Sequence, residues 1–202
     1  MFNLQKTTKK IAALLLSMAT VFAITSCERW TVMQYALEYG AEIFKVEVDG
    51  ASMMQTLQDG EQYYARRTEN GTGFERGDII VVYVGNYAEF GSTEFLVKRL
   101  IAIEGDSVKC TDGQIEIRYA GETEWTELYE PYAYYSQDKA KYDFAEYTVG
   151  EDEVFFLGDN RNNSMDSRYK EGFSRLNKLM IEQDVYGVLL DVDKGPLPQA
   201  EK

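Results

Sequence analysis

Short runs of residues that favour β-strands recur along this chain of 202 residues, and glycine-containing turns separate many of them. Asp59-Gly60, Glu104-Gly105-Asp106 and Asp112-Gly113 are examples of these turns. Short strands joined by such turns are typical of antiparallel sheets. We therefore predict a mainly β domain of antiparallel sheets, with a sandwich or barrel-like architecture. The predicted strands cover residues 62–65, 79–84, 95–104, 107–110, 114–119, 154–157 and 185–192.

The N-terminal segment has the character of an export signal or a membrane anchor. Lys6, Lys9 and Lys10 precede residues 11–26, which carry no charge, and Cys27 follows. As a helix, the uncharged run reaches about 24 Å, which is less than the ~30 Å hydrocarbon core of a bilayer. It therefore suits a cleaved signal, or an uncleaved anchor whose lysines extend its reach. Both alternatives put the rest of the chain on the outer face of the membrane.

The end of this segment resembles the cleavage site of a bacterial lipoprotein signal, in which a branched apolar residue and two small residues precede a cysteine. The four residues here are Ile24, Thr25, Ser26 and Cys27. In lipoproteins the cysteine is diacylated and becomes the new N-terminus, and two acyl chains give stable anchoring. A lipid anchor at Cys27 and an uncleaved signal anchor are the two alternatives, and both tether the domain to membrane lipid.

We expect four parts along the chain. Residues 1–27 form the signal anchor or lipoprotein signal segment, and residues 28–45 form a connector, with a short surface helix as one form of it. Residues 46–192 form the β-rich domain, and residues 193–202 form a C-terminal tail. Near residues 120–150 the composition shifts to Tyr and Glu. There we predict an insertion whose rings pack on the sheet, with an aromatic binding surface as the alternative.

The absence of histidine limits the chemistry of the chain, because it removes the Ser-His-Asp triad, the Cys-His pair and every His-ligated metal site. The formal net charge of −13 makes a surface that repels a phosphate backbone. Cys27 and Cys110 are too few for a thiolate metal cage, and we expect Cys110 to be a reduced core or strand-end thiol without a catalytic role. We therefore predict no metal, no cofactor and no nucleic-acid partner.

A serine and a lysine offer acyl-transfer chemistry without histidine. Ser52 follows the flexible Gly50 and precedes apolar residues, where its hydroxyl can meet an extended peptide. Lys98 lies in a predicted strand and shares a face with Leu96 and Leu100. Burial on that face disfavours the charged ammonium, so the pKa of the amine falls and it becomes a usable base. The alternative is a lysine that pairs with an acid or extends to solvent.

Residues 158–168 form a third segment, dense in polar residues that favour turns. Asp166 and Arg168 can form a bidentate ion pair, while Asn and Ser side chains cap the backbone of the loop. A calcium loop is the rival interpretation. It is disfavoured because Asp159 and Asp166 are far apart in sequence and Arg161 and Arg168 bring positive charge. The segment is therefore predicted to be a rigid polar loop.

These segments together resemble the bacterial type I signal peptidases, a family of membrane-tethered serine proteases with a Ser/Lys dyad. The resemblance covers residues 46–190. It rests on four segments in the order that the family has them, which are residues 50–60, 76–82, 95–106 and 158–168. The family fold is a β-rich core of two antiparallel sheets, in agreement with the mainly β domain predicted above.

The resemblance implies a role for each residue that matches a family motif. Ser52 is the attacking serine and Lys98 is the general base. Ser164 hydrogen-bonds the lysine amine, and the pair of Asp166 and Arg168 braces the site. The implied activity is the removal of signal peptides from exported preproteins at the extracytoplasmic face of a bacterial cell membrane. The substrate would bind as an extended strand along a sheet edge, with small residues before the cut.

The sequence departs from the family pattern at several positions. Gln55 and Glu104 stand where the family has proline, which is expected to alter the rigidity of two loops. Gly50 stands where some members carry a serine whose hydroxyl helps to hold the oxyanion. The oxyanion hole is therefore expected to rely on backbone N–H groups, chiefly that of Ser52. The short apolar segment that ends in Cys27 is also atypical of the family.

Two functions from other classes are alternatives. The first is a catalytically silent, membrane-tethered β domain that binds extended peptides, which requires a misaligned dyad. The second is a self-cleaving transcriptional repressor, because that family shares the Ser/Lys dyad and a related fold. A repressor needs a basic helix-turn-helix ahead of the dyad, and this chain has an apolar export segment there.

Overall fold

The computed structural model describes residues 28–69, 72–85, 94–168 and 184–192. The chain divides into two units, Met1–Ile43 and Phe44–Lys202, which are described separately below. The predicted anchor, including Cys27, and the predicted C-terminal tail lie outside the described residues.

The described part of the first unit is a helix over residues 28–39. Gly40 ends the helix in a left-handed conformation (φ 62°), and its N–H donates to the carbonyl of Ala36 at 3.0 Å. Trp30, Met33 and Leu37 recur at helical spacing and are exposed. The short surface helix that was one form of the predicted connector is therefore present. Within the described residues, no helix has both the length and the apolar character needed to cross a bilayer.

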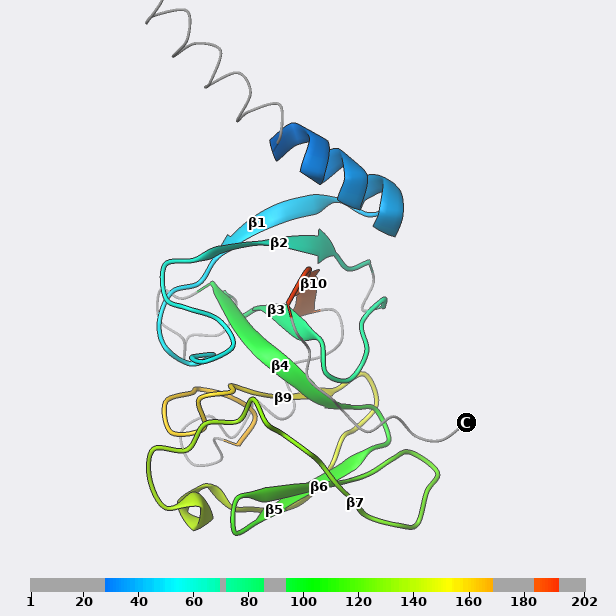
Figure 1. Ribbon diagram of the computed structural model, residues 1–202. Coiled ribbons are helices and arrows are strands. Elements are labelled where there is room, and N and C mark those ends of the chain that lie inside the picture. Colours follow the sequence, from blue (N-terminus) through cyan, green and yellow to red (C-terminus); the bar gives the residue numbers. More distant parts are fainter. Residues whose placement is uncertain (1–27, 70–71, 86–93, 169–183, 193–202) are drawn as a thin grey trace, which may run out of the picture. The chain divides into compact units, whose positions relative to one another are not determined.

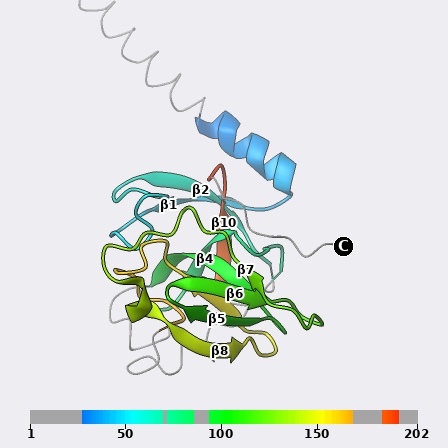
Figure 2. The same ribbon diagram turned by 60° about the horizontal axis from the view of Figure 1, so that its bottom comes forward.

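The second unit contains two sheets, which are visible in Figures 1 and 2. The larger has six strands in the order β1 (Ile43–Glu47), β2 (Gln62–Arg67), β10 (Val185–Leu189), β3 (Ile79–Tyr83), β4 (Phe95–Ile103) and β9 (Val154–Leu157). The smaller has four in the order β7 (Thr126–Glu127), β6 (Gln114–Arg118), β5 (Ser107–Thr111) and β8 (Phe144–Thr148). From β2 to β9, and throughout the smaller sheet, every neighbouring pair is antiparallel. The prediction of a mainly β domain with antiparallel sheets is confirmed.

Strand β3 is apolar at nearly every position because both of its faces are covered. Ile80 and Val82 point into one hydrophobic cluster. Ile79 and Val81 point into a second cluster on the other face, together with Met53 from the segment after β1. This second cluster ties the chain around Ser52 to the sheet.

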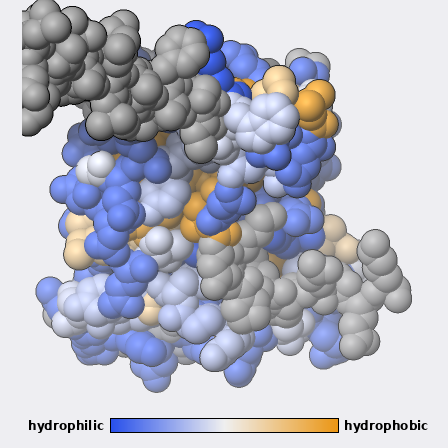
Figure 3. All heavy atoms as spheres, turned by 45° about the horizontal axis from the view of Figure 1, so that its top comes forward, coloured by the Kyte–Doolittle hydropathy of each residue, from blue (hydrophilic) through white to orange (hydrophobic). Residues whose placement is uncertain are grey.

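A third cluster links the two sheets. Ile101 of β4 and Phe155 of β9 pack in it against Val108 of β5 and Ile117 of β6. Strand β4 therefore contributes to the core at both ends, and the residues in its middle are held on both sides. The face drawn in Figure 3 is mostly hydrophilic, as expected from the net charge of the chain.

All seven predicted strands occur and begin at the predicted residue. Six of them end one to three residues away from the prediction, and the strand at 154–157 agrees at both ends. Strand β1 differs, because it begins at Ile43, inside the predicted connector. Its apolar residues Phe44 and Val46 alternate with charged ones and pack against the second cluster. The predicted Tyr/Glu-rich insertion contains β7, β8 and a short 3₁₀ helix, Lys139–Tyr142, which the sequence analysis did not resolve.

Candidate active site

Ser52 lies at the start of a tight turn that follows β1. The N–H of Leu57 donates to the carbonyl of Met53 at 2.9 Å, and both side chains are buried in the core. Gly50 has a φ of 94°, a left-handed conformation that suits glycine. Its N–H donates to the Asp59 carboxylate at 2.8 Å. The buried anchors therefore hold the turn against the sheet, and Ser52 is presented at its beginning.

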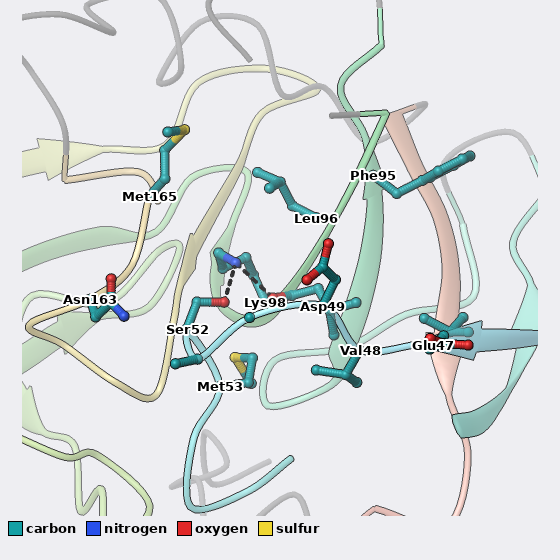
Figure 4. A pocket seen from close by; sticks show the side chains of 14 residues that line it. Glu47, Val48, Asp49, Ser52, Met53, Phe95, Leu96, Lys98, Asn163 and Met165 are labelled. Atoms are coloured by element: carbon teal, nitrogen blue, oxygen red, sulfur yellow. Dashed lines mark hydrogen bonds between the residues drawn. The ribbon is translucent and has the colours of Figure 1, made fainter. Parts of the chain in front are cut away.

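Lys98 lies in the middle of β4, opposite Ile80 of β3, and is 3% exposed. Its ammonium donates to Ser52 Oγ at 2.8 Å and to the carbonyl oxygen of Val97 at 2.8 Å (Figure 4). Burial lowers the pKa of Lys98 to about 8, although the charges of Asp166 and Asp159 oppose this shift. The structure thus brings the predicted serine and lysine into direct contact, and burial favours the neutral form of the amine.

A groove passes over this pair of side chains. It is lined by residues 46–53, residues 95–98, Asn163 and Met165 (Figure 4). In the described part of the chain, β4 pairs with β9 only from Arg99 onward. The outer edge of its first residues therefore faces the groove without a strand partner. Strand β1 is the terminal strand of its sheet and forms the opposite wall. Two open strand edges beside a serine suit the binding of an extended peptide.

The loop of residues 158–168 is bonded directly to the turn of residues 52–57, here named the nucleophile turn after the role expected of Ser52. The N–H of Asn160 donates to the carbonyl of Ser52 at 3.0 Å. Its side-chain amide donates to the carbonyl of Ala51 at 2.9 Å. Asn160 was not among the predicted site residues. Its sequence position offered no signal, because it meets residues more than a hundred positions away.

Asp166 and Arg168 form the predicted bidentate ion pair, with both N···O distances at 2.8 Å. Burial alone would raise the pKa of Asp166, but the charge and hydrogen bonds of Arg168 lower it. The Asp166 carboxylate also accepts the N–H of Gly158 at 3.0 Å. The pair therefore holds the end of β9 where the polar loop begins.

The hydrogen bond expected between Ser164 and Lys98 does not form in this structure. The Ser164 hydroxyl is buried, its side chain lies against Gly158, and its nearness to Asp166 helps to lower the pKa of that carboxyl. The Lys98 amine instead bonds Ser52 and the carbonyl of Val97. This expectation is therefore corrected: Ser164 lies near the loop end of β9 but does not orient the amine here.

The backbone N–H groups of Gly50 and Ser52 differ in whether another group already accepts a hydrogen bond from them. The N–H of Gly50 is taken by Asp59, so Gly50 shapes the turn and does not offer this donor. Among the described residues, no hydrogen bond uses the backbone N–H of Ser52. This is the group that the sequence analysis expected to hold the oxyanion.

A second buried ion pair lies beside the dyad and was not predicted. Arg99 follows Lys98 in β4, and its guanidinium binds the Asp159 carboxylate at 2.8 and 2.7 Å, with both side chains fully buried. The same carboxylate accepts the Thr56 hydroxyl from the nucleophile turn. Asp159 therefore joins strand β4 to the nucleophile turn.

Cys110 is buried in the cluster between the sheets, as expected for a core thiol. Its sulfur lies 3.7 Å from the Asp143 carboxylate. Burial, reinforced by the charge of Asp143, raises the pKa of the thiol to about 12. The thiolate that reactive cysteines require is therefore disfavoured.

The chain is similar to known proteins of one family. The family model described as signal peptidase, peptidase S26, matches residues 13–186. The chain is 40% identical over 129 residues to signal peptidase I P of Bacillus subtilis subsp. natto, covering 60% of this chain and 63% of the relative. It is 35% identical over 130 residues to signal peptidase I S of Bacillus subtilis strain 168, covering 60% and 64%. Another match, to a signal peptidase I P of subspecies natto, is 34% identical and covers 70% and 71%.

The aligned region spans somewhat less than two thirds of the length of the first of these relatives. Among solved structures, the chain is similar to the crystal structure of a signal peptidase I from Enterococcus faecalis V583. That match has 28% identity and a TM-score of 0.42, and it covers 59% of this chain and 98% of the other.

Proposed function

The chain belongs to the signal peptidase family, peptidase S26, and from this we propose that it is a serine endopeptidase that removes signal peptides from exported preproteins. The observation that carries the proposal is the 2.8 Å contact between Lys98 Nζ and Ser52 Oγ inside a groove with open strand edges. A Ser/Lys pair of this kind supplies a nucleophile and a base without histidine.

The proposed reaction proceeds through an acyl-enzyme. The neutral amine of Lys98 accepts the Ser52 hydroxyl proton as Ser52 Oγ attacks the scissile carbonyl. The backbone N–H of Ser52 stabilises the oxyanion. The protonated amine then gives a proton to the leaving amine of the substrate. Lys98, neutral again, takes a proton from the water that attacks the ester and returns it to Ser52 Oγ as the acyl group leaves.

The substrate is proposed to lie as an extended strand between the edge of β1 and the open edge of β4. Main-chain hydrogen bonds would supply affinity, and small side chains before the cut would enter shallow pockets of the groove. Asp166 and Arg168 are proposed to brace the site through Gly158. The alternative of a silent peptide-binding domain requires a misaligned dyad, and the contact between Ser52 and Lys98 argues against it.

Cleavage of a preprotein tests the proposed activity. We expect the full-length chain, purified in detergent, to cut a bacterial preprotein once, after its signal peptide. Sequencing of the new N-terminus identifies the bond. A Ser52→Ala variant serves as the control and should leave the preprotein intact. The proposal is wrong if the wild-type chain leaves every preprotein uncut, or if the Ser52→Ala variant cuts as fast as the wild type.

We also propose that the catalytic domain is tethered to a bacterial membrane on its extracytoplasmic face, with residues 1–27 as the tether, residues 28–45 as the connector, residues 46–192 as the catalytic part and residues 193–202 as a tail. The lysines before the apolar run support this orientation. The family assignment supports the same arrangement.

Mass spectrometry of the protein extracted from membranes distinguishes the two tethers. A lipoprotein anchor predicts a diacylglyceryl group on Cys27 and loss of residues 1–26. An uncleaved signal anchor predicts an intact Met1 terminus and no lipid. We expect one of these two products, and recovery of the protein in the soluble fraction with neither would contradict a membrane tether.

A further inference from the structure

The Tyr/Glu-rich insertion is bonded to the polar loop that carries Asn160. The N–H of Tyr134 donates to the carbonyl of Asp159 at 2.8 Å, and the N–H of Arg161 donates back to the carbonyl of Tyr134 at 2.9 Å. The N–H of Ser136 donates to the side chain of Asn162. Residues 130–136, here named the buttress segment, therefore follow the loop like a short added strand.

A buried ion pair strengthens this contact. Arg161 is 1% exposed, and its guanidinium binds the Glu130 carboxylate at 2.6 and 3.1 Å. Its Nε donates to the carbonyl of Gly158 at 3.0 Å. A buried guanidinium without its carboxylate is strongly unfavourable, so Glu130 and Arg161 hold the segment and the loop together.

Tyr132 of the buttress segment lies over the ion pair beside the dyad. The Arg99 guanidinium is 3.7 Å from the centre of the Tyr132 ring. This is a close cation–π contact in a desolvated place, where such contacts are strongest. The Tyr132 hydroxyl donates to the Glu130 carboxylate at 3.2 Å. The ring is therefore held by this hydrogen bond and by its contact with Arg99.

The contacts continue from Tyr132 to the nucleophile. Arg99 holds Asp159, and Asp159 accepts the Thr56 hydroxyl from the nucleophile turn. The next residue, Asn160, binds the carbonyls of Ala51 and Ser52. The residues that line the groove include none from the insertion. The insertion therefore reaches Ser52 through the loop and not through the groove.

We propose that the buttress segment positions the active site and that Tyr132 is a positioning residue for Ser52, acting through Arg99 and Asp159. This inference rests on the proposed peptidase function and assigns a role to the insertion. Tyr132 serves the geometry of the turn that begins at Ser52.

The test compares variants of Tyr132 in the full-length chain with a preprotein substrate. Tyr132→Leu removes the aromatic face over Arg99. A small displacement of Ser52 slows the reaction but leaves substrate binding in the groove unchanged. We therefore expect kcat to fall by about 10- to 100-fold and KM to stay within about twofold. Tyr132→Phe keeps the ring, so its kcat should stay within about threefold of wild type.

Tyr129→Leu is the matched control, because Tyr129 immediately precedes the buttress segment and is 67% exposed. It should leave kcat and KM unchanged. Tyr132→Met fills similar space without an aromatic face and takes the place of Tyr132→Leu if that variant does not fold. Folding of each variant is checked by circular dichroism, and kcat is taken per folded molecule.

Three outcomes overturn the inference while wild-type cleavage stands. These are an unchanged kcat in the Leu and Met variants, a rise of KM at constant kcat, and a loss in Tyr132→Phe equal to that in Tyr132→Leu. The second would mean that the segment binds substrate after all. If the wild-type chain cuts no preprotein, the proposed peptidase function is wrong. That result differs from the three outcomes above, which contradict only the positioning role of Tyr132.

Discussion

Replacing Lys98 with arginine is expected to lower turnover on a preprotein by about a thousandfold or more. The guanidinium keeps the charge and much of the bulk of lysine, but it cannot lose a proton in the working pH range. It therefore cannot accept the proton of Ser52, whose Oγ lies 2.8 Å from the Lys98 amine. Lys98→Ala and Ser52→Ala should be as inactive, and kcat/KM measured on each variant checks this.

The Lys98 and Ser52 variants should keep the fold, because no described residue forms an ion pair with Lys98. Its amine bonds only Ser52 and the carbonyl of Val97 among the described residues. Far-UV circular dichroism should therefore match the wild type. If Lys98→Arg keeps a tenth of wild-type turnover with the same cleavage site, the dyad assignment is wrong. The base would then be one of the carboxylates near Ser52.

The same assignment predicts the pH dependence of the wild type. Only the neutral amine accepts a proton, and burial lowers the pKa of Lys98 to about 8. Below that value kcat/KM should rise about tenfold per pH unit, and above it the rate should level off. If Lys98 had the pKa of a lysine in water, the rate would level off only above about pH 10.4. A profile without any inflection between pH 7 and 9 would contradict the lysine base.

Gly158→Ala is expected to reduce kcat by about a hundredfold, the second large effect. A methyl group at Gly158 would lie 2.6 Å from the carbonyl oxygen of Ser52 and would also press on the side chain of Ser164. The carbonyl is backbone and cannot turn away, so the nucleophile turn has to shift. Steady-state kinetics on a preprotein, with thermal unfolding alongside, measures the effect.

Overpacking of this kind costs about 1–3 kcal/mol of stability, so the variant should remain folded at 25 °C. Gly150→Ala is the matched control, because the atoms nearest to its added methyl group belong to the flexible carboxylate end of Glu153. It should keep kcat near the wild-type value. A Gly158→Ala enzyme with full kcat would show that Ser52 does not depend on this close approach.

The strands were predictable because their evidence is local. The runs at β3 and β9 are apolar, short and bounded by turns, and these properties follow from neighbouring residues. Strand β1 was missed because its alternating residues follow a helix and share its mixture of apolar and charged positions. The short strands β7 and β8 were missed because tyrosine and glutamate dominate the composition there.

Some features of the site could likewise be predicted from nearby residues, and others could not. The pair of Asp166 and Arg168 was predictable because the two residues are two positions apart and meet within one loop. The pair of Ser52 and Lys98 was a chemical possibility in a chain without histidine, and the resemblance to the type I signal peptidases assigned the two residues their roles. The hydrogen bond expected from Ser164 failed because its direction depends on how the loop packs against Gly158.

The sequence by itself determined which types of side chain the site contains: a serine, a lysine in an apolar strand, and an Asp–Arg ion pair in a polar loop. Only the tertiary structure decided which distant groups touch. Arg99 meets Asp159 across 60 positions, and Asn160 meets Ala51 across 109. Such contacts depend on strand register and on the packing of separate loops. A register shift of one residue turns each side chain to the other face, and no local pattern records it.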